Sequence, residues 1–156
     1  MAREFSLTYD IGPMLDLVGK TDHKTLAAWA ADCAGRVMPY FEEKYPDDPR
    51  PGMALEALRA WIWSGIFRMA DIRRASLDAH AAAREAGGDN AARSAARAAG
   101  QAVATTHVPT HSVAAAGYAL QAVYRASDPS LANAAVAKER DWQYRHLLGL
   151  MEKSAS

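Results

Sequence analysis

The residues of this sequence with the most versatile chemistry are its five histidines, His23, His80, His107, His111 and His146. A neutral imidazole is a common metal ligand and can act as an acid or a base near neutral pH. His107 and His111 are four residues apart, which is the spacing of two zinc ligands on one helical face. Pro109 lies between them and no glutamate follows His107, so we expect a helix boundary there. His107 also continues the apolar row of the preceding segment, which favours a core position.

His80 lies at helical spacing from Arg73 and Arg84, two cations that would lower its pKa. Asp78 is two residues away and points to another side of the helix, so the two side chains cannot form a local catalytic pair. Arg74 and Asp78 belong to a neighbouring row of alternating charge. This pattern is typical of a solvated helix face that is rich in ion pairs.

Arg93 and Arg97 are one helical turn apart and could converge on a carboxylate or a phosphate, with ordinary surface charge as the alternative. No phosphate-binding loop accompanies them, because Gly87-Gly88 lacks the lysine and the spacing of a P-loop. Cys33 falls on an apolar helical face, where we expect it to be a core residue.

Trp61 and Trp63 cannot face the same side of one element, so one of the two is expected at the surface. An exposed indole beside the acidic turn at Asp47 and Asp48 would make a protein-binding patch. Arg50 follows the same turn. Together with Arg74 and Asp78, these residues are our candidates for partner contact, and packing at the edge of the domain is the alternative for the tryptophan.

The elements that must position these side chains are expected to be helices. The chain contains 35 alanines, of which 19 lie between Ala79 and Ala126, and alanine is the best helix former. Apolar spacing and helix start and stop signals predict about six helices, which would form an antiparallel bundle or stacked helical pairs. They are expected at 22–44, with a kink or an end at Pro39, and at 53–67, 71–86, 90–106, 109–126 and 130–151. Closely packed alanines leave little room for a large cofactor, and we expect none.

Residues 1–21 are expected to form an extended N-terminal arm that precedes one helical domain at 22–156. Phe5, Leu7, Tyr9 and Ile11 alternate with polar residues, which is the period of a strand. A single strand is not stable alone, so the arm would lie on the helices or form a homo-oligomer by pairing with a second copy.

Charge and composition limit the classes of partner. Eighteen basic residues balance eighteen acidic ones, so binding to nucleic acid or to an anionic membrane is not favoured. The chain has one cysteine, no signal peptide and no apolar run long enough to span a membrane. The expected location is the cytoplasm.

Most of the chain from about Asp22 to Gln143 falls into three stretches with a specific order of motifs. The first begins at Leu26 and reads LAAWAADCAGRVMPYFE, and the second runs from Arg50-Pro51 to ALEALRAW, which ends at Trp61. The third combines AHAAAREA at 79–86 and AAGQAVATTH at 98–107, and is followed by KERDWQ at 138–143. Together they resemble a bacterial family of immunity proteins, which are small helical domains of polymorphic toxin systems. In this family we would expect a histidine before Ala102, where the chain has Gln101.

The resemblance implies a binding protein that neutralises a protein toxin, and it implies no catalytic residues. The alternative is a small helical enzyme, or a ligand- or metal-binding domain, whose histidines meet across the bundle. Its site would be built from His80, His107, His111 and Glu139. The residues themselves favour a binding protein over an enzyme.

Overall fold

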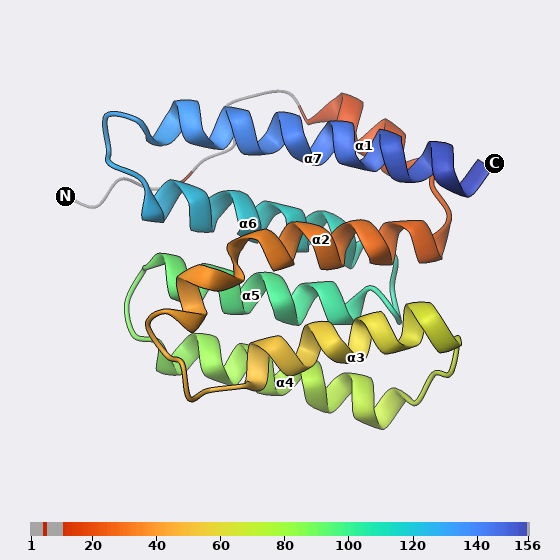
Figure 1. Cartoon of the computed structure of the whole chain (residues 1–156), viewed down its shortest axis with the longest axis horizontal. Helices are drawn as coiled ribbons and strands as arrows, with labels where there is room; N and C mark the ends of the chain where they lie inside the picture. The colour runs from red at the N-terminus through yellow and green to blue at the C-terminus, as the bar shows by residue number, and fades with distance from the viewer. Residues whose placement is uncertain (1–4, 6–10, 156) are drawn as a thin grey trace.

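The computed structural model describes residue 5 and residues 11–155, and there the chain forms seven packed α-helices without a strand (Figure 1). This confirms the predicted all-α class. One helix more than expected is present. The helices are α1 (Gly12–Gly19), α2 (His23–Glu42), α3 (Arg50–Ser64), α4 (Met69–Glu85), α5 (Ala91–Ala104), α6 (His111–Ala126) and α7 (Ala132–Ala155). None of the helices in these residues is long and apolar enough to span a membrane.

The additional helix is α1, so the prediction of extended backbone throughout residues 1–21 is wrong for 12–19. Pro13 fits the first turn of α1, where a missing N–H leaves no hydrogen bond unmade. Val18 is buried, and Met14 and Leu17 pack against the core. The predicted alternation at 6–10, and pairing with a second copy through it, lies outside the described residues. The ring of Phe5 meets that of Tyr124 edge to face, with centroids 5.5 Å apart.

The helix boundaries follow local signals. Asp22 caps α2 by accepting a hydrogen bond from the Thr25 N–H at 2.8 Å, and Asn90 caps α5 in the same way. The α2 helix continues through Pro39 to Glu42. The α3 helix ends at Ser64, three residues before the predicted end, because Gly65 adopts a φ of 71° and reverses the chain.

The helices are arranged in layers (Figure 1). The α1 and α7 helices lie along one side of the molecule, α3 and α4 lie along the opposite side, and α5 lies between these sides in contact with α2, α3, α4 and α6. Six of the nine buried residues of α5 are alanines, which let neighbouring helices approach closely. The largest fully buried side chains include Trp29, Phe41, Leu58 and Leu147.

Cys33 is buried in this core, as predicted. Burial raises the pKa of its thiol well above the usual value, and the nearby carboxylates of Asp32 and Glu139 raise it further. The thiol therefore stays protonated at neutral pH. Such a side chain packs as a small apolar group and is a poor nucleophile.

Candidate functional site

Four large apolar side chains are exposed where α3 turns into α4. Trp63 is 92% exposed and Ile66 is 67% exposed, and Phe67 and Met69 follow within the next three residues. We call Trp63, Ile66, Phe67 and Met69 the apolar corner. Trp61, two residues before Trp63, is only 8% exposed, so the prediction that these two tryptophans face different sides is confirmed.

The backbone around Gly65 explains why these side chains face solvent. The Gly65 N–H donates to the Trp61 carbonyl at 2.7 Å, and the Ser64 hydroxyl accepts a hydrogen bond from the Ile66 N–H at 3.2 Å. These bonds close α3 and direct the chain out of the helix. The predicted helix at 53–67 therefore ends too late, and Gly65 was the signal that could have revealed it.

A groove of about 400 Å³ lies beside the apolar corner, between α4 and the connection from α5 to α6. Met69 belongs to both the corner and the groove. The Phe67 ring stacks on the His107 imidazole with centroids 6.4 Å apart, and His107 is also part of the groove wall. The residues lining the groove are Met69, Ile72, Arg73, Ser76, Leu77, Ala104, His107 and His111.

Three histidines predicted to matter lie on the α4–α5–α6 side of the molecule. His107 is exposed, so its expected core position is wrong, because the chain has already left α5 at that residue. His111 Nδ1 lies 2.7 Å from the Oε1 atom of Gln101. His80 Nδ1 lies 2.8 Å from an Nη atom of Arg97. Gln101 and Arg97, the partners of these two histidines, both belong to α5 and are one turn apart.

The pKa of His80 is lowered to about 4, mainly because the ring is partly buried and further because Arg97, Arg84 and His111 are nearby. The predicted lowering of the His80 pKa is confirmed, and Arg84 contributes to it as expected. The ring is therefore neutral at pH 7. Its Nδ1 atom accepts a hydrogen bond from Arg97, which fixes the Arg97 guanidinium against the helix surface.

Glu139 is separated from these histidines, unlike in the predicted cluster. Its carboxylate accepts hydrogen bonds from Arg36 Nε at 2.7 Å and Nη2 at 2.8 Å, on the α2–α7 side. The same guanidinium lies 3.9 Å from the centre of the Trp142 ring. Within residue 5 and residues 11–155, no three His, Cys, Asp or Glu side chains are arranged to hold a metal ion.

The acidic turn lies at the other end of α3 from the apolar corner. Arg50 binds Asp48 at 2.7 Å and also pairs with Glu85, so the turn is attached to the end of α4. Asp47 is exposed. Trp63 lies thirteen positions after Arg50 on the same helix, a distance of about 20 Å at 1.5 Å per residue. The predicted patch that combines the indole with this turn is therefore not formed.

Arg74 and Asp78 lie closer to the corner. Both are exposed on α4 and line a shallow hollow that also contains Met69 and Leu77. Of the six predicted partner-contact residues, Arg74 and Asp78 thus lie beside Met69 of the apolar corner, to which Trp63 also belongs. Asp47, Asp48 and Arg50 lie at the far end of the α3–α4 pair.

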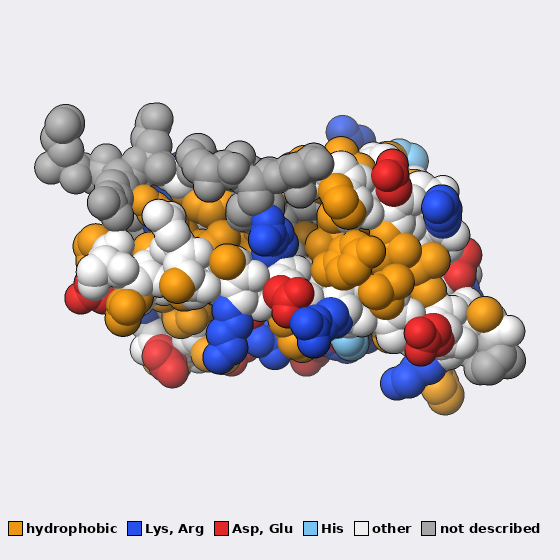
Figure 2. All heavy atoms as spheres, turned by 90° about the horizontal axis from the view of Figure 1, so that it is seen from above, with side chains coloured by type: hydrophobic (Ala, Val, Ile, Leu, Met, Phe, Trp, Pro, Cys, Tyr) orange, Lys and Arg blue, Asp and Glu red, His pale blue; other side chains and the backbone are white. Residues whose placement is uncertain are grey.

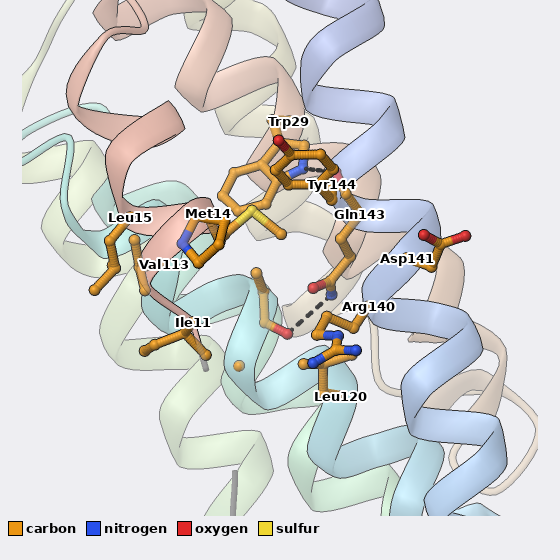
Figure 3. A pocket seen from close by; sticks show the side chains of 13 residues that line it. Ile11, Met14, Leu15, Trp29, Val113, Leu120, Arg140, Asp141, Gln143 and Tyr144 are labelled. Carbon is orange, nitrogen blue, oxygen red and sulfur yellow. Dashed lines mark hydrogen bonds between the residues drawn. The ribbon is translucent and has the colours of Figure 1, made fainter. Parts of the chain in front are cut away.

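A second cavity, of about 280 Å³, lies between α1, α6 and α7 (Figure 3). Trp29 and Gln143 lie at its base: the Gln143 amide donates to the Ala116 carbonyl at 3.0 Å, and the Trp29 indole N–H donates to the Gln143 carbonyl at 2.9 Å. Gly117 also lines it. Figure 2, which views this side of the molecule, shows apolar side chains gathered among charged ones. The sequence provided no signal for this cavity, since its lining comes from four separate segments.

A family model described as "Imm-5 like putative immunity protein" matches residues 16–150. No curated protein and no solved structure matches the chain.

Proposed function

Because the chain belongs to the Imm-5 like putative immunity protein family, we propose that it binds a protein toxin and neutralises it. The apolar corner and the adjoining groove are the surface that makes the contact. Of the predicted contact residues, Trp63 belongs to the corner together with Phe67 and Met69, and Arg74 and Asp78 line the shallow hollow that shares Met69 with it.

The observation that carries this proposal is the exposure of Trp63 beside three other large apolar side chains. Isolated apolar residues are common on protein surfaces, whereas a group of four within seven residues is typical of an interaction site. Tryptophan is strongly enriched among the residues that dominate binding energy. The groove beside the corner offers a concave surface for a side chain of the partner.

Binding of a small ligand by the histidines is the second candidate. His107 and His111 line the groove, and His80 lies along the same α4–α5 seam. Glu139, which the predicted site required, lies on the α2–α7 side with Arg36. The geometry therefore favours protein binding through the corner.

The test is capture of the toxin from the source organism on immobilised full-length protein, followed by titration of the purified toxin. Trp63→Ser should weaken binding about 30-fold or more, as expected for a central tryptophan. It should also abolish protection of toxin-expressing cells, while the unfolding midpoint stays unchanged because the side chain is 92% exposed.

Leu131→Ser is the matched control. Leu131 is 62% exposed and precedes the first residue of α7. Figure 1 shows the α6–α7 connection at the opposite end of the molecule from the α3–α4 connection. This variant should bind as the unmodified protein does. Failure to recover any toxin, or equal binding by both variants, would contradict the proposal.

A further inference from the structure

A group of arginines without carboxylate partners lies on α4 and α5. In the part of the chain that the structure describes, Arg73, Arg84, Arg93 and Arg97 form no ion pair. We call these four arginines, together with His80 and His111, the basic face. Five other arginines, Arg36, Arg50, Arg59, Arg125 and Arg145, each pair with a carboxylate.

Contacts between helices place these groups on one side of the molecule. Arg97 binds His80 across the α4–α5 seam, and Gln101, one turn further along α5, binds His111 of α6. Arg84 is one turn from His80 on α4 and is close enough to help lower the pKa of its imidazole. Arg73 lines the groove together with His111.

The acidic residues of this region do not neutralise the basic face. Glu85 pairs with Arg50 at the start of α3, and Asp89 pairs with Arg125 of α6. Asp78 lies two residues from His80 and therefore points to another side of α4. The chain as a whole has zero net charge, so the basic face is a local excess of positive charge.

The basic face is continuous with the proposed toxin-binding surface. Arg73 and Leu77 both line the groove, and Met69 connects the groove to the apolar corner. A partner that covers both regions must present carboxylates next to apolar side chains. Nucleic acid fits this combination poorly, because it offers phosphates but no aliphatic side chains.

We infer that the toxin segment bound by this protein is acidic, with Asp or Glu carboxylates over Arg84, Arg93 and Arg97 and an apolar side chain in the groove. This inference rests on the proposed function. Arginine suits the task because its planar guanidinium can hold a carboxylate through two parallel hydrogen bonds. His80 holds the Arg97 side chain in place before the toxin binds, which lowers the conformational entropy cost of binding.

The test compares full-length variants in titrations with the captured toxin at 50 and 300 mM NaCl. Arg84→Gln combined with Arg97→Gln should weaken binding about 10- to 100-fold at the lower salt, mainly through slower association. The affinity of the unmodified protein should fall as salt rises. Arg84→Glu is a second variant, because its exposed side chain has no packing role. Arg145→Gln is the control, since Arg145 is an exposed arginine on α7.

The outcomes separate the two proposals. In one outcome the toxin binds and Trp63→Ser weakens the binding, but neither salt nor either arginine variant changes the affinity. This outcome would overturn the inference of an acidic segment and leave the proposed function standing. Tighter binding of a 20-base-pair DNA duplex than of the toxin, lost in the same variants, would assign the basic face to nucleic acid. Absence of any toxin binding would overturn both.

Discussion

Replacing Gly100 with alanine should destabilise the protein, whereas the same change at Gly117 should stabilise it. Both glycines lie inside helices, α5 and α6 respectively. A Cβ added at Gly100 would lie 2.7 Å from His80 Nε2 and 2.9 Å from Cε1. A Cβ added at Gly117 has no heavy atom within 4 Å.

The expected magnitudes follow from opposing effects. Alanine inside a helix is favoured over glycine by about 1 kcal/mol at both positions. At Gly100 the His80 ring must move, which breaks its hydrogen bond with Arg97 at a cost of about 1–2 kcal/mol, and crowding costs a further ~1 kcal/mol or more. We therefore expect Gly100→Ala to lose about 1–2 kcal/mol net and Gly117→Ala to gain about 0.5–1 kcal/mol.

Urea denaturation and thermal unfolding measure these differences, with about 2–4 °C in Tm per kcal/mol for a chain of this size. NMR titration of His80 adds a reading specific to the mechanism. Its pKa, lowered to about 4 by burial and by Arg97, should rise towards 6.5 in Gly100→Ala as the ring moves into solvent. Equal stabilisation by both substitutions, with an unchanged His80 pKa, would refute the reasoning.

Three further outcomes are expected. His80 takes up its proton near pH 6.5 when unfolded but near pH 4 when folded, so the free energy of unfolding should fall by about 1–2 kcal/mol from pH 7 to 4.5, allowing for partial exposure. Urea titrations should show that His80→Gln reduces this fall. Arg36→Met should cost about 2 kcal/mol, because it leaves the nearly buried Glu139 carboxylate unpaired, and adding Glu139→Gln should recover part of that loss in a thermal melt. Gln143→Leu should cost about 1–2 kcal/mol in urea by removing the hydrogen bond to the Ala116 carbonyl, and an unchanged midpoint would contradict that role.

Local signals were sufficient to predict most helices. Asp22 and Asn90 cap the helices that they were expected to start, and Gly87 and Gly88 adopt the positive φ angles that end α4. The α1 helix was missed because Ile11 completes an alternating pattern that resembles a strand. Pro13 was the local signal for this helix, because proline suits the first turn of a helix.

The candidate site could be predicted only in part. The spacing of Trp61 and Trp63 required one exposed indole but did not determine which of the two it would be. Pairings between residues far apart in sequence, such as Arg36 with Glu139, depend on how the helices stack and have no local signal. The exposed position of His107 depended on where α5 ends, and helix ends are the least certain feature of a sequence pattern.

The alanine-rich interior around α5 has a consequence for how this protein can diverge from its relatives. Positions such as Ala95, Ala98 and Ala99 are fully buried, so a larger side chain at any of them must push neighbouring helices apart. The apolar corner and the basic face consist mainly of side chains that reach solvent, and most of these can change without repacking the interior. We therefore expect relatives with different toxin specificities to differ mostly at these surfaces, while their α5 helices remain nearly the same.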